Sequence, residues 1–386
     1  MRSTQSFSRR QNKMAGFTLV ELLVAMFIFG VISAASFGLL MQSQPLFKQQ
    51  QGLAALNIAI RNSAAQLQLD VANGGSNYYN GINIPNWPVG VVVANNTPAV
   101  DCETSTTTYV YGASCFDSMN IIASDPGTLP SNVTDGTIAG CHLTNGTTMY
   151  LSPTNANPAG SGYPTLAAAT TAAGNFKYNA GVNPDQILLV KGNGSAYTTA
   201  VLTATPAAAT VGGRFYVQLT HGATNADGTN AALTNDPLQI TVNQDTAAGT
   251  YQNTMLSDSY CATDYVLRLT PVMYSVDTTN PINPTLVRQE PGSATATVQK
   301  LAEQIIGFKV MVTLINDPAG NVYHWKNSDY LNNYTFVRSI RISLIGRTVP
   351  TTDPTYVFRN TFDTGPYQVQ GISLVINPRN MSMGDN

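Results

Sequence analysis

The sequence predicts an α+β fold in which one long N-terminal helix precedes a β-rich remainder. Residues 17–41 carry one formal charge, that of Glu21, and contain no proline. Residues 337–345 alternate apolar and polar, as a half-buried strand does. Between them lies an amphipathic stripe whose apolar residues recur at helical spacing, namely Leu46, Leu53, Leu56, Ile60, Ala64 and Leu67. These patterns predict a helix with an apolar half and an amphipathic half, the second half packed on a β-sheet.

The apolar run is long enough to cross a membrane, because about 20 apolar residues span a bilayer as a helix. The basic residues ahead of it are Arg2, Arg9, Arg10 and Lys13, and the first sixteen residues include no acidic one. Positive charge beside a membrane helix stays in the cytoplasm. The sequence therefore predicts a cytoplasmic leader, with everything after Met41 on the far side.

Glu21 is unusual inside this run. A carboxylate at the centre of a membrane helix costs about 2.5–3.5 kcal/mol, and less near the interface. A cut between Gly16 and Phe17 would create an α-amino group about one helical turn from Glu21. That amine would be the nearest cation, within one chain or between staggered neighbouring chains.

The stretch Gly16-Phe17-Thr18-Leu19-Val20-Glu21 resembles the processing site of type IV prepilins and type II secretion pseudopilins. The resemblance implies that a membrane peptidase cuts after Gly16 and methylates Phe17. It assigns Glu21 to subunit assembly, facing a neighbour's N-terminus. It also implies a pilin-like fold, with the long helix packed on an antiparallel sheet.

A second resemblance lies near the C-terminus. The pieces LVRQ, LAEQIIGFKV and VRSIRISLIGRT are similar, in that order, to the C-terminal region of PilW-type minor pilins. Pseudopilin J of type II secretion has a related strand–loop–strand ending. The two resemblances cover the ends of the chain only.

Two other interpretations of the N-terminus remain open. A secretory signal peptide could be cut after Ser33-Ala34-Ala35, which leaves Glu21 inside its core without a purpose. A plain membrane anchor would stay uncut. Mature chains beginning at Phe17, beginning at Ser36 or uncut would distinguish the three.

The chain divides by composition into five segments. The first two are a leader over residues 1–16 and the helix over 17–70, which Asn73-Gly74-Gly75 stops. A β-rich, loop-heavy insertion over 71–260 follows, with short apolar stretches between Gly, Asn, Pro and Thr. A C-terminal sheet region over 261–348 and an extension over 349–386 complete the chain. Gly38 and Pro45 predict a flexible stretch within the helix.

The four cysteines are Cys102, Cys115, Cys141 and Cys261, all on the predicted translocated side. Disulfides are the default in an oxidising compartment, and four cysteines allow three pairings. We favour Cys102–Cys115, which closes a short loop and leaves Cys141–Cys261. Four reduced, buried thiols are the alternative.

Nothing in the sequence indicates catalysis or a cofactor. It contains no serine nucleophile elbow, phosphate-binding loop, HExxH or CxxC. The histidines, His142, His221 and His324, are scattered, and His142 beside Cys141 is a poor metal pair because neighbouring strand residues point to opposite faces. Asn316-Asp317 with Asn321 is typical of an Asx-turn rather than a calcium site. Net charge is -2 without a basic block, so no nucleic-acid site is predicted.

The resemblance implies a minor pilin, a structural subunit of a type IV pilus. Its expected location is the inner membrane, with the C-terminal domain in the periplasm and later in the surface fibre. The implied partners are major and minor pilins, prepilin peptidase, the inner-membrane assembly platform and, before assembly, membrane lipid. The implied roles are pilus assembly, twitching, adhesion and DNA uptake. Alternatives are a type II secretion pseudopilin and a membrane-tethered adhesin that binds through residues 71–260.

Overall fold

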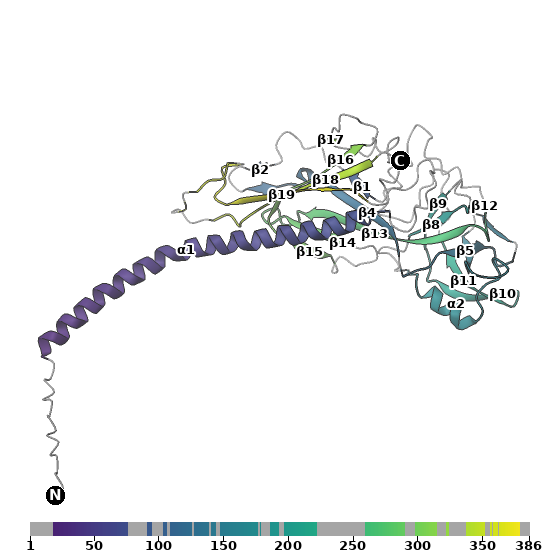
Figure 1. Ribbon diagram of the computed structural model, residues 1–386, viewed down its shortest axis with the longest axis horizontal. Helices are drawn as coiled ribbons and strands as arrows, with labels where there is room; N and C mark the ends of the chain where they lie inside the picture. Colours follow the sequence, from purple (N-terminus) through teal and green to yellow (C-terminus); the bar gives the residue numbers. More distant parts are fainter. Residues whose placement is uncertain are drawn as a thin grey trace, which may run out of the picture. The chain divides into compact units, whose positions relative to one another are not determined.

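The structure is a computed structural model, and it confirms the predicted α+β class: a long apolar N-terminal helix precedes a domain rich in antiparallel sheet (Figure 1). It divides the chain into two units, residues 1–54 and 55–386. The described residues are 18–75, 91–94, 103–105, 109–125, 127–138, 140–143, 147–176, 178, 186–192, 197–221, 259–289, 298–314, 322–323, 337–351, 356, 358–361 and 363–378.

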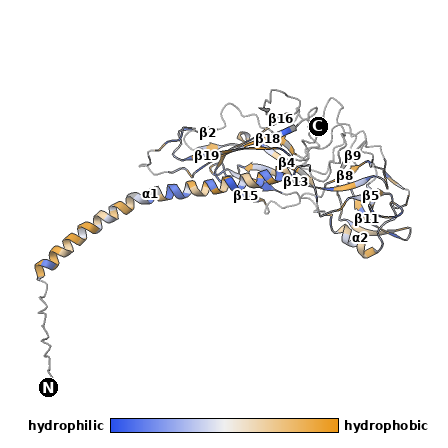
Figure 2. Ribbon diagram, in the orientation of Figure 1, coloured by the Kyte–Doolittle hydropathy of each residue, from blue (hydrophilic) through white to orange (hydrophobic). Residues whose placement is uncertain are grey.

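Helix α1 (Leu19–Ala72) begins after Thr18 and ends at the predicted stop, Asn73 to Gly75. It runs through Gly38 and Pro45 without interruption, where the sequence predicted a flexible stretch. Glycine and proline cost about 1 and 3 kcal/mol in a helix interior. Extending an existing helix avoids a new nucleation step, so a long helix can carry such residues. Figure 2 shows α1 almost wholly apolar over its first half and mixed over its second.

Within the described residues, every strand pairing is antiparallel. The largest sheet contains β1 (Val91–Ala94), β4 (Ser118–Ser124), β5 (Ser131–Thr134), β7 (Thr148–Pro153), β8 (Gln186–Val190), β9 (Tyr197–Val201), β10 (Ala207–Val211), β11 (Arg214–Thr220), β13 (Tyr265–Asp277), β14 (Thr285–Gln289) and β15 (Gln299–Ala302). A four-stranded sheet has the order β17 (Val322–Tyr323), β16 (Ile305–Leu314), β18 (Val337–Arg347), β19 (Val369–Ile376). Two small sheets pair β6 (Cys141–Leu143) with β12 (Ser259–Cys261), and β2 (Glu103–Ser105) with β3 (Val110–Tyr111).

Strand β13 connects the two hydrophobic cores of the larger unit. Its first part, Tyr265–Leu269, pairs with β8, and with β5 at its first two residues. Its second part pairs with β4 and, from Met273 onward, with β14. Val266 lies in one core and Tyr274 in the other. The sheet therefore continues across residues 260 and 261, where composition suggested a domain boundary.

The first core covers the amphipathic half of α1. Leu56, Ile60, Leu67 and Val71 are buried there among residues of the four-stranded sheet and of β1, β4, β14 and β15. The predicted inward face of β18, Ile340, Ile342 and Leu344, is buried in the same core. At Gly346, an added Cβ would lie 2.8 Å from Leu56 Cδ1 and 3.0 Å from Ile60 Cδ1, so the strand approaches the helix closely.

A polar cluster attaches the end of α1 to the sheet. Asp70 accepts hydrogen bonds from the Tyr274 hydroxyl, at 2.6 Å, and from Arg288 Nε, at 2.8 Å. Burial, followed by the Asp70 hydrogen bond, raises the pKa of Tyr274. An aspartate near a helix C-terminus opposes the helix dipole, and the Arg288 charge offsets this.

Arg347, at the end of β18, is almost fully buried. It donates to Gln304 Oε1 at 2.8 Å, to the Tyr109 carbonyl at 2.9 Å and to the Ile282 carbonyl at 2.8 Å. Its guanidinium also lies over the rings of Tyr111 and Tyr367. These contacts join four separate loops at one end of the four-stranded sheet.

The second core lies between α2 (Leu166–Ala173) and the strands β5, β7, β8 and β11. Helix α2 was not predicted, because its sequence LAAATTAA is short and only weakly amphipathic. Thr165 caps it, since its side chain accepts from the Ala168 amide. The 3-10 turn η1 (Ala113–Cys115) belongs to the first core instead, through Cys115.

Two element boundaries differ from the predicted ones. Strand β16 begins at Ile305, three residues before the predicted Phe308, because Glu303 and Gln304 form the turn that follows β15. The segment 349–386, predicted as an extension, contributes β19, which pairs with β18 along its full length.

We expect Arg347→Lys to lower the free energy of unfolding by about 2–4 kcal/mol, because lysine cannot satisfy all three acceptors and buried unsatisfied groups cost 1–3 kcal/mol each. Urea unfolding of the full chain in detergent measures this. Arg341→Lys is the matched control, since Arg341 is exposed on the same strand. Equal losses for the two variants would contradict the role given to Arg347.

Candidate functional site

The first turn of α1 holds Glu21 in a reciprocal cap with Thr18. The Thr18 amide donates to Glu21 Oε2 at 2.9 Å, and the Thr18 hydroxyl donates to the same oxygen at 3.0 Å. The Glu21 amide donates in return to Thr18 Oγ1 at 3.2 Å. This is a capping box, in which side chains satisfy amides that the first helical turn leaves open. The Glu21 carboxylate therefore has partners within its own chain.

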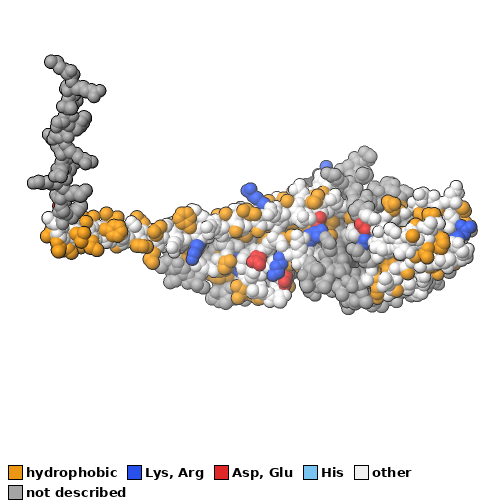
Figure 3. All heavy atoms as spheres, turned by 90° about the horizontal axis from the view of Figure 1, so that it is seen from below, with side chains coloured by type: hydrophobic (Ala, Val, Ile, Leu, Met, Phe, Trp, Pro, Cys, Tyr) orange, Lys and Arg blue, Asp and Glu red, His pale blue; other side chains and the backbone are white. Residues whose placement is uncertain are grey.

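An exposed apolar surface surrounds this cap. Leu19–Met41 forms a helical segment of 23 residues that is long and apolar enough to cross a membrane. Its large side chains are exposed, for example Phe27 and Phe29 at 73% each. Figure 3 shows hydrophobic side chains covering this end of the helix. A patch of this size on a protein surface requires lipid or a protein neighbour to cover it.

The predicted processing residues Gly16 and Phe17 lie outside the described residues. The cut and the methylation therefore stay predictions, as does the role of Glu21 in assembly. Thr18 was not singled out from the sequence. The signal that could have found it is the spacing Thr-x-x-Glu at the start of an apolar helix.

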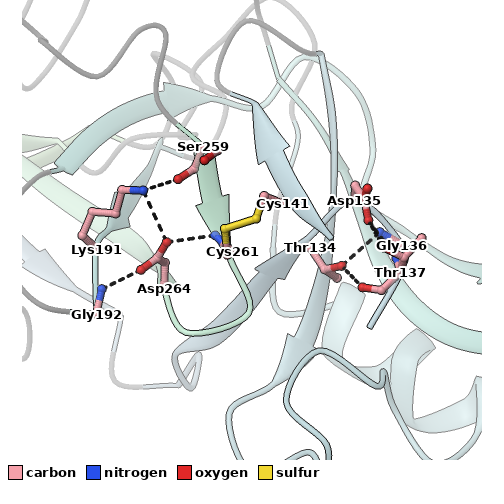
Figure 4. Close-up of a disulfide and its surroundings, with 10 residues drawn as sticks. All are labelled: Thr134, Asp135, Gly136, Thr137, Cys141, Lys191, Gly192, Ser259, Cys261 and Asp264. Atoms are coloured by element: carbon pink, nitrogen blue, oxygen red, sulfur yellow. Dashed lines mark hydrogen bonds and ion pairs between the residues drawn. A yellow bond between two sulfur atoms is a disulfide. The ribbon is translucent and has the colours of Figure 1, made fainter. Parts of the chain in front are cut away.

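Cys141 and Cys261 form a disulfide between β6 and β12, where they are directly opposed in the strand register (Figure 4). Cys115 is buried, and Cys102 lies outside the described residues. The Cys102–Cys115 pairing therefore stays a prediction.

Charged groups surround the disulfide, as Figure 4 shows. Asp264 accepts from the Cys261 amide and from the Gly192 amide, both at 2.8 Å. Lys191 lies 3.7 Å from the Asp264 carboxylate, donates to the Ser259 carbonyl and stands over the Tyr260 ring. These contacts fix the loop between β12 and β13.

Two of the scattered histidines meet in the second lobe. His142 of β6 and His221 after β11 are both buried, with their Nε2 atoms 3.0 Å apart. Sequence reasoning missed the pair, because the two residues are 79 positions apart and no pattern links them. The Calcium-type ligands Asn316, Asp317 and Asn321 lie outside the described residues, as does His324.

Burial and the neighbouring His221 lower the pKa of His142 to about 4, against the opposing effects of a hydrogen bond with Thr148 and the charge of Asp135. The unfolded chain, with a histidine pKa of about 6.5, therefore binds a proton at mildly acidic pH that the folded chain does not. We expect stability to be constant above that value and to fall by about 2 kcal/mol from pH 7 to pH 5 on this account.

Unfolding of the full chain at several pH values measures the effect. His142→Gln should flatten this part of the profile, and His324→Gln serves as the control that leaves the pair intact. An identical pH slope in wild type and His142→Gln would refute the assignment.

Comparison with known protein families identifies one match, the prokaryotic N-terminal methylation motif, over residues 11–37. No curated protein and no solved structure matches the chain. The match includes Gly16, Phe17 and the capped Glu21. The chain thus carries a type IV pilin-like prepilin signal at its N-terminus, followed by a helix consistent with a membrane anchor. This signal implies processing by prepilin peptidase and assembly with other pilins, which is a structural rather than a catalytic role.

Proposed function

We propose that the protein is a minor pilin, a structural subunit that primes or caps a type IV pilus. The observation that carries the proposal is the prepilin motif together with Glu21 in the first turn of an exposed apolar helix. The N-terminal amine produced by cleavage before Phe17 would lie close to this carboxylate. In this proposal the chain waits in the inner membrane with its domain in the periplasm, and then enters the surface fibre.

The Thr18–Glu21 cap supports a two-stage role for the carboxylate. Before assembly, two donors of Thr18 satisfy Glu21 Oε2 within the chain, which lowers the cost of a carboxylate among lipid. On assembly, the methylated amine of a neighbouring pilin pairs with it. Two buried opposite charges cost less together than either does alone, and their pairing gives register to a uniform apolar interface. Repetition of this head-to-tail contact builds a helical filament.

The domain beyond the helix supports a low-copy position. The second lobe adds a separate core and a disulfide to the part of the domain that covers α1. Such bulk would crowd a fibre shaft, and we therefore place the subunit at the tip or in the priming complex. The partners in this proposal are major and minor pilins, the prepilin peptidase and the assembly platform. Twitching, adhesion and DNA uptake are the processes it would serve.

The second lobe also favours a binding role, which is compatible with a tip subunit. A lobe with its own core can present a surface independently of the helix. Binding of the intact chain to a cell surface or polysaccharide, lost when the lobe is altered but with fibre entry kept, would support this role.

We expect Glu21→Gln to be cleaved and methylated normally but to be absent from fibres, because the amide keeps the shape and loses the charge that meets the amine. Mass spectrometry of sheared surface fibres tests this, by searching for a chain that begins with methylated Phe17. Glu303→Gln is the matched control, since Glu303 is an exposed glutamate in a turn far along the chain. Entry of the Glu21→Gln chain at the wild-type level would refute the mechanism.

Deletion of the protein separates a pilus from a secretion system. A minor pilin role predicts loss or reduction of surface pili with secretion intact. Loss of secretion with normal pili would assign the chain to a type II secretion pseudopilus instead.

A further inference from the structure

The buried histidine pair has the geometry of a metal site. The Nε2 atoms of His142 and His221 lie 3.0 Å apart, and the ring centroids lie 5.0 Å apart. Since a ring nitrogen lies a little over 1 Å from its centroid, these two distances require the nitrogens to face each other nearly head-on. Both side chains are almost inaccessible to solvent.

The tautomer of His142 leaves its Nε2 lone pair directed at this point. Thr148 forms a backbone hydrogen bond with His142 that favours the protonated imidazole, so the acceptor is the Thr148 carbonyl. Because Nε2 faces His221, the nitrogen that donates to this carbonyl is Nδ1. Metal-binding histidines are typically held in this way, with the second ring nitrogen donating to a backbone carbonyl.

The ligand number selects the ion. In the part of the chain that the structure describes, no group of three His, Cys, Asp or Glu residues could hold a metal. Zinc requires about four ligands, whereas copper(I), a monovalent d10 ion, is stable with two opposed nitrogens. We propose that His142 and His221 form a two-coordinate copper(I) site in the second lobe of this protein.

Proton competition at this site is weak. Burial and His221 hold the pKa of His142 near 4, so the lone pair stays available over the neutral and mildly acidic range. The negative charge of Asp135, which acts on His142, also favours a cation there. Binding needs no net proton release, because His221 keeps its single ring proton and moves it from Nε2 to Nδ1.

Binding requires a small rearrangement. A metal–imidazole bond is about 2 Å long, so two opposed nitrogens must stand about 4 Å apart. Each ring must therefore withdraw by about 0.5 Å from its position in the structure. His142 lies on the short strand β6, and His221 follows the end of β11, so both are at the ends of the lobe's strands rather than in its central strands.

The test is transfer of copper(I) from its bicinchoninate complex to the full chain, in detergent, without oxygen and with free thiols alkylated. We expect the wild type to take up one copper(I) ion, and His142→Gln and His221→Gln to bind it at least about 100-fold more weakly. His324→Gln is the matched control and should bind as the wild type does. Uptake by the wild type no greater than by the two variants would overturn the proposal.

X-ray absorption of the wild-type copper(I) complex keeps the test decisive if either variant fails to fold. We expect two nitrogen neighbours at about 2 Å and no sulfur. Sulfur ligands, or three or more neighbours, would overturn the two-histidine site. Zinc(II) chloride, offered separately, should not displace the copper, and displacement would refute the two-coordinate assignment. The outcome is independent of whether the chain enters a pilus.

Discussion

The structure depends on covering one apolar stripe of α1. Leu56, Ile60, Leu67 and Val71 are fully or almost fully buried, and a buried side chain of this size contributes about 1.5–3 kcal/mol. No single sheet encloses the stripe, because residues of the four-stranded sheet and of the larger sheet both enter the same core. The glycine at 346 brings β18 close to the helix. The polar cluster at Asp70 then sets where the helix ends on the sheet.

The two halves of α1 have opposite requirements that follow from composition. In the second half a single face is apolar, and the protein itself covers that face. In Leu19–Met41 apolar residues occur all round, and the described chain covers none of them. One polar feature interrupts this surface, the Thr18–Glu21 cap, and its hydrogen bonds are satisfied locally. A helix that is apolar on all sides needs lipid or other helices around it, and both environments are available to a type IV pilin-like subunit.

Periodicity predicted the helix and the inward face of β18, because Ile340, Ile342 and Leu344 repeat with the pleat of a strand. Periodicity could not predict the second lobe, where strands are short and separated by loops. Nor could it predict Arg347 and Gln304, which lie in the motif pieces near the C-terminus but meet only through the fold. The histidine pair is the extreme case, since its members come from different strands and each is an ordinary residue in its own segment. Local patterns encode faces of elements, whereas clusters of side chains from distant segments arise from tertiary pairing alone.

The Cys141–Cys261 bond also bears on how the chain would respond to mechanical load. It joins positions 120 residues apart. If tension were applied through the two ends of the chain, the covalent bridge would carry it past the enclosed segment. At about 3.4 Å per extended residue, some 400 Å of contour length would be withheld from stretching. The second lobe would thus be shielded from pulling, while the segments before and after it would carry the strain.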